Sequence, residues 1–266
     1  MHLAYLLTSD SEYLEVAALI DSLIVEDDQV FVIHNNPKVM DRLRIYYGNH
    51  PEVHLYPAQD FALTGDLSLA RGTLVMLREA LESTFDYVIN LTDGMAPIKP
   101  RDQLVSYLEE HPQDHYQIYS DEHKDPSLRK KYERYYPFTN LSYFQHEGFT
   151  RLLSKGLASI IHLFKKRNFP YTYVITSPWF VLSRATARLL VEHFGFLSQN
   201  FMLFWYPEEV WLGTMLEMLN HHEHINNDLR WLYPDGDFYP GISPAKGSQQ
   251  PTGARPVFFA AKRSSE

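Results

Sequence analysis

The sequence lacks cysteine altogether, which excludes disulfide bonds and thiolate chemistry and is typical of proteins in a reducing compartment. It also lacks any run of about 18 consecutive apolar residues, so we expect no integral membrane segment. The N-terminal sequence MHLAYLLTSDSEYLE has no basic region before its apolar run, so it is not typical of a secretory signal. These absences favour a cytoplasmic protein, and we assign no role to the glycosylation sequon that begins at Asn90.

An excess of basic charge is missing as well, since 33 acidic residues outnumber 24 basic ones and the net charge is −9. Nucleic-acid binding depends on neutralising phosphates, so we expect no nucleic-acid partner. Positive charge is nevertheless concentrated locally. The segment 151–170 has five basic and no acidic residues, and the C-terminal tail carries Arg255, Lys262 and Arg263. This pattern indicates a small anionic ligand or an anionic surface.

Strand patterns alternate with helical patterns through much of the chain, which has 266 residues, 45% of them hydrophobic. Apolar or alternating runs predict strands at 2–7, 29–34, 53–56, 86–92, 115–120, 254–262 and, as two short segments, within 173–183. Helical spacing predicts helices at 11–24, 37–47, 67–83, 101–111, 151–167, 184–194 and from Pro207 onward. The alternation favours an α/β fold with a mostly parallel sheet flanked by helices. The size of the chain allows one large domain.

Several segments stand out as landmarks: VIHNN (32–36), VINLTDGMAPIKPRDQLVSYL (88–108), WFVLSR (179–184), PEEVWLGTML (207–216), NNDLRWL (226–232) and ARPVFFAAK (254–262). In their order and spacing, the chain resembles the glycosyltransferase family that includes the core-2 and I-branching β-1,6-N-acetylglucosaminyltransferases and the peptide O-xylosyltransferases. The likeness covers nearly the whole chain and is loosest over 112–170. It therefore carries implications for fold, reaction and site residues together.

The resemblance implies a GT-A-like (Rossmann-like) fold in one compact domain, 1–266. The nucleotide-binding half would span 1–120, and the acceptor and catalytic half 121–266. The implied reaction is an inverting, metal-independent transfer of GlcNAc or xylose from a UDP-sugar to a glycan or glycoconjugate hydroxyl. The partners are therefore a nucleotide-sugar donor and a glycan or lipid-linked acceptor, with no cofactor or metal besides the UDP-sugar co-substrate.

The resemblance places Glu209 as the general base and Lys262 as the cation that stabilises the leaving diphosphate, with Arg255 and Arg263 close enough to assist. A solvated cationic tail is the alternative for these basic residues. Glu209 and its neighbour Glu208 fall in the first turn of the helix predicted from Pro207, where acids also stabilise a helix N-terminus. Neighbouring helical residues point about 100° apart, so we expect only one of these carboxylates to face the cleft.

The remaining expected contacts follow from the same likeness. On the nucleoside side they are Thr8, His34 and Asn36. On the acceptor side they are Trp179, Glu208 and Ser177. For His34 a structural role is an alternative, and for Trp179 and Trp211 core packing is at least as good an interpretation as stacking on a sugar.

Departures from the family pattern leave other functions open. Relatives tend to have Asp where this chain has Asn36, a different turn residue where it has Pro178, and Arg where it has Ala261. A non-catalytic protein that binds nucleotides or sugars is therefore an alternative. A metal-dependent enzyme would need the triplet Asp235-Gly236-Asp237, whose Asp-Gly pair is more typical of a turn. The cluster from His221 to His224 lacks the spacing of a helical metal site and favours a polar loop.

The predicted helix at 151–167 combines apolar residues with basic ends. This pattern is typical either of a helix packed on the core or of one that lies on an anionic membrane and meets a lipid-linked acceptor. Because the sequence shows no membrane stem like that of the Golgi members of the family, we expect a soluble, bacterial-type enzyme of surface-polysaccharide synthesis. The helix at 151–167 would allow it to act as a peripheral protein at the inner face of the membrane.

Overall fold

The computed structural model describes residues 1–56, 67–92, 95–137, 148–231 and 256–261. Seven strands of this part of the chain form one sheet in the order β3-β2-β1-β4-β7-β6-β8. Their bounds are β1 Leu3–Ser9, β2 Gln29–His34, β3 Val53–Tyr56, β4 Tyr87–Thr92, β6 Asp114–Asp121, β7 Val174–Ser183 and β8 His224–Asn226. A second sheet, in the order β5-β10-β9, consists of β5 Met95–Pro97, β10 Phe259–Ala261 and β9 Arg230–Trp231.

The large sheet is mostly parallel, as the alternation of strands and helices predicts. Strands β1 to β4 run parallel to one another, and β8 runs parallel to β6. Strand β7 is antiparallel to both of its neighbours, β4 and β6. The strand order reverses beside β1, because β2 and β3 lie on one side of it and β4 on the other. In open α/β sheets, such a reversal leaves a crevice at the carboxyl ends of the strands.

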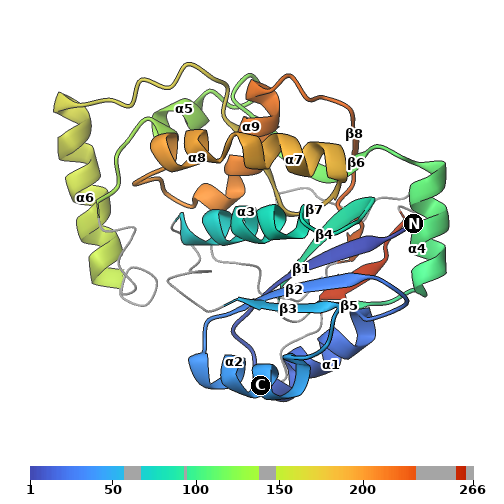
Figure 1. The fold of residues 1–266 in the computed structure, drawn as a ribbon. Coiled ribbons are helices and arrows are strands. Elements are labelled where there is room, and N and C mark those ends of the chain that lie inside the picture. The colour runs from blue at the N-terminus through green and yellow to red at the C-terminus, as the bar shows by residue number, and fades with distance from the viewer. Residues whose placement is uncertain (57–66, 93–94, 138–147, 232–255, 262–266) are drawn as a thin grey trace.

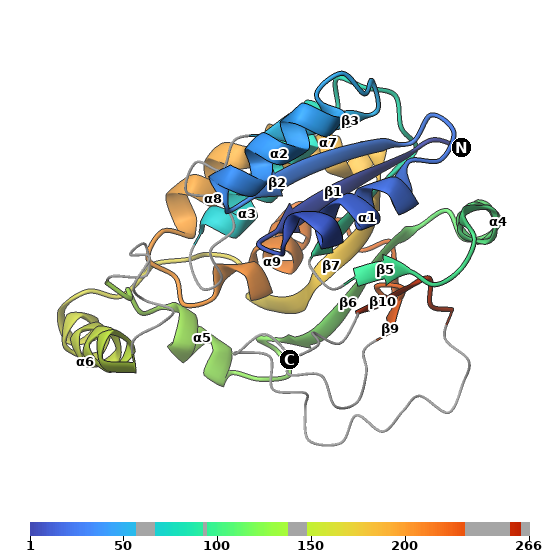
Figure 2. The ribbon, with the colours of Figure 1, turned by 90° about the horizontal axis from the view of Figure 1, so that it is seen from below.

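Helices cover both faces of the large sheet (Figure 1). One face carries α1 (Tyr13–Leu23) and α2 (Pro37–Tyr47), with α4 (Arg101–Glu110) contributing to the same core. The other carries α3 (Ser68–Ala80), α7 (Arg184–Glu192), α8 (Phe194–Asn200) and α9 (Trp211–Met218). Two further helices, α5 (Ser127–Tyr132) and α6 (Gly148–Phe164), lie toward one end of the molecule. The second sheet lies on the α1 side (Figure 2).

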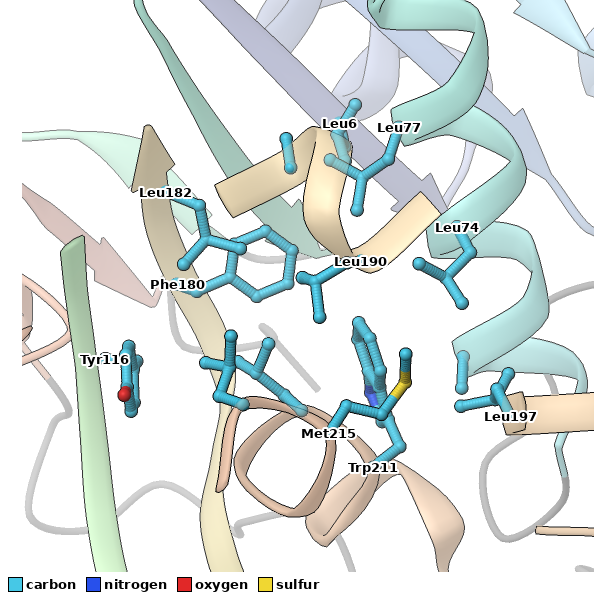
Figure 3. Close-up of a cluster of buried hydrophobic side chains, with 14 of the residues drawn as sticks. Leu6, Leu74, Leu77, Tyr116, Phe180, Leu182, Leu190, Leu197, Trp211 and Met215 are labelled. Atoms are coloured by element: carbon cyan, nitrogen blue, oxygen red, sulfur yellow. The ribbon is translucent and has the colours of Figure 1, made fainter. Parts of the chain in front are cut away.

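Each face of the large sheet has its own hydrophobic core, because successive side chains of a strand point to opposite faces. Along β1, Leu6 joins the core beneath α3, α7 and α9, whereas Leu7 joins the core beneath α1 and α2. In the first core, Leu74 of α3 and Leu190 of α7 gather over Phe180 of β7 (Figure 3). Because both faces are covered, the central strands are apolar along almost their whole length.

The predicted α/β fold in one domain is confirmed, and most predicted elements lie within a few residues of their expected bounds. Three local predictions are wrong. The two short strands predicted within 173–183 form the single strand β7, and the helix predicted at 184–194 ends at Glu192, with a separate α8 after it. Residues Pro207–Glu209 form a 3-10 turn, because Val210, at φ −124°, interrupts the helical backbone before α9 begins. The division of labour between residues 1–120 and 121–266 stays a prediction.

Gly213 lets α9 pack directly on β7. A Cβ at this position would lie 2.5 Å from Thr176 Cγ2 and 2.8 Å from Val174 Cγ1. Both distances are well below van der Waals contact, so a side chain here would push α9 away from the sheet. This contact also anchors the chain segment that follows the 3-10 turn.

We expect Gly213→Ala to lower the free energy of unfolding by about 1–3 kcal/mol, because the added methyl overpacks the contact between α9 and β7. Urea denaturation followed by circular dichroism measures this change. The matched control is Gly156→Ala in α6, where an added Cβ meets nothing within 4 Å. The control should leave stability unchanged or raise it by about 0.5–1 kcal/mol. Equal effects of the two changes would contradict the packing argument.

Candidate active site

A pocket opens where β1 and β4 end, at the reversal of the strand order. Thr8 of β1 pairs in register with Thr92, the last residue of β4, and both line the pocket. Including its open mouth, the pocket encloses about 620 Å³ of space between its atoms. The lining comes from the strand ends, α3, β7 and the turn before α9: Thr8, Leu69, Thr73, Met76, Asn90, Leu91, Thr92, Pro178, Trp179, Tyr206, Glu208, Glu209 and Trp211.

Strand β7 bulges at the pocket. Between two successive register pairs, β6 advances by two residues whereas β7 advances by four, from Thr176 to Phe180. Pro178 has no N–H to offer a ladder, and proline within a sheet is confined to edges and bulges. The bulge brings Pro178 and Trp179 into the pocket lining. The turn expected before Trp179 is therefore a bulge within a strand.

Asn90 holds this bulge from the neighbouring strand β4. Its Nδ2 donates to the Pro178 carbonyl at 2.7 Å, and its Oδ1 accepts the Phe180 N–H at 2.6 Å. Backbone pairing between β4 and β7 extends only to Ile89 and Val181. Beyond this point, where β7 bulges, the Asn90 side-chain amide makes the hydrogen bonds between the two strands. Asn90 is a functional candidate that the sequence interpretation missed. The available signal was a lone polar residue inside the apolar run DYVINLT.

Buried charged residues support the bulge from the opposite side. Arg230 donates to the carbonyls of Asn90, at 2.5 Å, and of Asp228. Asp228 accepts the Ser177 hydroxyl at 2.5 Å, and Ser177 Oγ accepts the Trp179 N–H at 3.1 Å. Burial lowers the pKa of Arg230 to about 10 and raises the pKa of the Asp228 carboxyl. Ser177, predicted to contact the acceptor, lies beneath the pocket as part of this support and not among the lining residues.

Two buried carboxylates reach the pocket from the 3-10 turn before α9. Glu208 and Glu209 are only 5% and 4% exposed, and both line the pocket. The turn does not have the α-helical geometry on which the expected 100° separation depended, and which of the two carboxylates faces the cleft stays a prediction. Tyr206, which precedes the turn, has φ 51° and ψ 63°, a left-handed conformation that costs an L-residue free energy. Such conformations are held by their surroundings and occur often at functional sites.

Glu209 has two polar neighbours from α5. The Lys131 Nζ lies 3.6 Å and the Tyr132 hydroxyl 3.5 Å from Glu209 Oε2. Burial raises the pKa of Glu209 above its usual value, while Lys131 and Tyr132 counteract part of that rise. Burial and the charge of Glu209 hold the pKa of Tyr132 well above its ordinary value, so its hydroxyl remains a donor. No sequence pattern indicated these neighbours, because Tyr132 is 77 residues from Glu209 along the chain and Lys131 is one residue farther.

For Trp179 and Trp211 the sequence left two roles open, core packing and contact with a sugar, and the structure has features of both. Each is 3% exposed, and they belong to the cores on opposite faces of the sheet. Each also lines the pocket, and Trp179 Nε1 donates to Thr92 Oγ1 at 3.3 Å. Stacking of either ring on a sugar stays a prediction.

Of the predicted nucleoside contacts, Thr8 lines the pocket and the other two shape the end of β2. His34 is buried, with Nε2 2.8 Å from the Ser11 carbonyl and Nδ1 accepting the Asn36 N–H at 2.9 Å. Asn36 Oδ1 accepts the Lys38 N–H at 3.0 Å and so caps the N-terminus of α2. His34 thus has the structural role that the sequence left open, and its contact with a nucleoside stays a prediction.

Outside the described residues lie the predicted diphosphate-binding residues Lys262, Arg255 and Arg263, and the triplet 235–237. Within the described ranges, no group of three or more His, Asp or Glu side chains gathers as a metal site. His221 Nε2 instead lies 2.6 Å from Asp114 Oδ2, and His224 stacks on Tyr116 at 4.1 Å. No helix in this part of the chain is both long and apolar enough to cross a bilayer.

The mostly parallel seven-stranded sheet flanked by helices is consistent with a GT-A-like fold. Residues 3–251 match the family model described as the core-2/I-branching enzyme. The chain belongs to this family, which is a family of glycosyltransferases. Among curated proteins, none matches the chain. The family assignment and the pocket therefore point to a sugar donor and a glycan acceptor as the reactants.

We expect Arg230→Met to lower the free energy of unfolding by about 2–5 kcal/mol, because it leaves buried carbonyls and a buried carboxyl without their donor or neighbouring cation. Urea denaturation measures the loss. The control is Arg78→Met, since the Arg78 side chain is 62% exposed and pairs with its sequence neighbour Glu79. This change should alter stability by no more than about 0.5 kcal/mol. An Arg230→Met protein as stable as the wild type would show that the buried network does not support the fold.

Proposed function

We propose that this glycosyltransferase moves a sugar, GlcNAc or xylose, from a UDP-sugar to a hydroxyl of a glycan or glycoconjugate, with inversion and without a metal ion. Glu209 acts as the general base. The observation that carries this proposal is the position of the Glu209 carboxylate: it lines the pocket at the strand reversal and is buried beside Lys131 and Tyr132.

The reaction requires a base at the acceptor hydroxyl. As the acceptor oxygen attacks the anomeric carbon, Glu209 accepts its proton, and the bond to the diphosphate breaks on the opposite side of the sugar. Burial raises the pKa of Glu209, which makes the carboxylate a stronger base than an exposed glutamate. Lys131 and Tyr132 offset part of this rise, so they favour the carboxylate form that the base needs.

The other lining residues suggest how the reactants are held. Glu208 and Trp179 would contact the acceptor or the transferred sugar, since a carboxylate accepts from sugar hydroxyls and an indole packs on a pyranose face. Ser177 would act through the bulge that positions Trp179. Thr8, at the end of β1, would contact the nucleoside together with His34 and Asn36.

The leaving diphosphate needs positive charge, for which we propose Lys262 with Arg255 and Arg263. Chain connectivity supports this assignment for Lys262. Strand β10 ends at Ala261 opposite Met95, and Met95 follows closely on the pocket residue Thr92. Each charge-assisted hydrogen bond to the diphosphate contributes about 1.5–3 kcal/mol, so two or three could take the place of a metal ion.

We expect Glu209→Gln to lower kcat by about 10²–10⁴-fold, because glutamine cannot accept the hydroxyl proton. UDP release from a panel of UDP-sugars measures this, with and without EDTA. The wild-type activity should survive EDTA. The control Glu217→Gln, at a half-exposed position of α9, should retain it. UDP binding without release would support a non-catalytic protein, and loss of activity in EDTA would exclude the metal-independent reaction.

The pH dependence tests the role of the Glu209 environment. A base works deprotonated, so kcat should fall as the pH drops through the raised pKa of Glu209. Lys131 favours the carboxylate form, and removing its charge in Lys131→Met should raise the pKa of Glu209 further. The acidic limb of the kcat profile should therefore move to higher pH, which initial rates across the pH range would reveal. Lys130→Met, a change at the adjacent exposed lysine, serves as the control; a shifted limb in both variants or in neither would contradict this role for Lys131.

A further inference from the structure

Helix α6 exposes large apolar side chains to solvent. Those with the highest exposure are Leu152, Ile160, Leu163 and Phe164, at 70%, 55%, 79% and 87%, and Leu153 is exposed at 44%. Single exposed apolar residues are common, but a group of five on one helix indicates an interaction surface. We call these five side chains the α6 ridge.

The α6 ridge occupies one side of the helix. At 100° per residue, its members fall within an arc of roughly 120°. The opposite side holds Ser154 and Ala158, both fully buried, and Ser154 Oγ donates to the Pro137 carbonyl. Gly156 also falls within the arc, and a Cβ placed there would meet nothing within 4 Å. The helix is therefore attached through its small residues and presents its large apolar residues outward.

The sequence segment that contains the α6 ridge carries charge of one sign. Residues 151–170 include five basic and no acidic residues, although the whole chain has a net charge of −9. Lys155, Lys165 and Lys166 are exposed. Arg167 is used internally, since it donates to the carbonyls of Asn200 and Met202 at 2.7 Å each. An apolar ridge among exposed lysines is complementary to a surface with an apolar interior and anionic head groups.

The position of α6 suits such a surface. The helix lies at the edge of the molecule in both views, away from the large sheet (Figures 1 and 2). It is nevertheless connected to the pocket rim, because the Lys155 ammonium lies 5.0 Å from the centre of the Trp205 ring. The next residue, Tyr206, lines the pocket. A surface bound by α6 would therefore lie near the pocket.

We propose that α6 is an interfacial helix that docks this enzyme on an anionic lipid bilayer, with the α6 ridge inserted at the boundary between head groups and acyl chains. A second copy of the chain fits this helix less well. Paired copies of 151–170 would bring together only positive charges, because the segment has no acid to pair with them. This docking is independent of the catalytic role of Glu209, so each proposal can fail without the other.

The test is co-sedimentation of the purified full chain with vesicles. We expect binding to vesicles of phosphatidylglycerol and phosphatidylcholine in equal amounts and weak binding to phosphatidylcholine alone, with a loss of affinity as salt rises. Leu163→Glu combined with Phe164→Glu should weaken binding to the anionic vesicles by at least about tenfold, because it removes two of the most exposed apolar side chains.

The matched control is Leu14→Glu combined with Ile45→Glu, at 74% and 86% exposed positions on α1 and α2. This variant should bind the vesicles about as well as the wild type, apart from a small electrostatic loss. Circular dichroism and UDP release verify that both variants are folded. The proposal is overturned if the wild type ignores anionic vesicles, if it binds neutral ones equally, or if the α6 variant still binds. It is also overturned if light scattering shows a dimer that only the α6 variant disrupts.

Discussion

The side-chain amide of Asn90 substitutes for backbone pairing between β4 and β7, and the shape of the pocket depends on that substitution. An unsupported bulge would leave the Pro178 carbonyl and the Phe180 N–H without partners in the interior of the sheet. Arg230 completes the arrangement by donating to the Asn90 carbonyl from β9. Three strands from distant parts of the sequence thus hold one irregularity, and that irregularity brings Trp179 to the pocket.

The environment of Glu209 illustrates a balance between burial and charge. Burial alone would favour the protonated carboxyl, which is no base. Lys131 and Tyr132 favour the carboxylate, but their distances of 3.6 and 3.5 Å to Oε2 leave it only loosely held. A carboxylate with raised basicity and no tight partner can still accept a proton. Glu208 lines the same pocket and is also buried, so the two neighbouring glutamates lie at one site.

Much of the fold was predictable because its signals are local. The apolar strands and the amphipathic helices follow from side-chain periodicity, and most of them lie where that periodicity indicated. The start of α9 was not predictable in the same way. Pro207 followed by two acids is a good helix start, but the left-handed backbone at Tyr206 and the break at Val210 are set by packing against β7 and α3. Similarly, the bulge at Pro178 required knowledge of the partner strands.

The sequence by itself determined the α/β class, the strand and helix order, and the membership of a glycosyltransferase family, because each depends on patterns read along the chain. Only the tertiary structure decided that Glu208 and Glu209 both line one pocket, and that Lys131, Tyr132 and Asn90 belong to the same site. It also decided which side of α6 faces solvent. The physical reason is common to these cases: burial and contact are properties of residues distant in sequence, and a single chain pattern does not encode which of them meet.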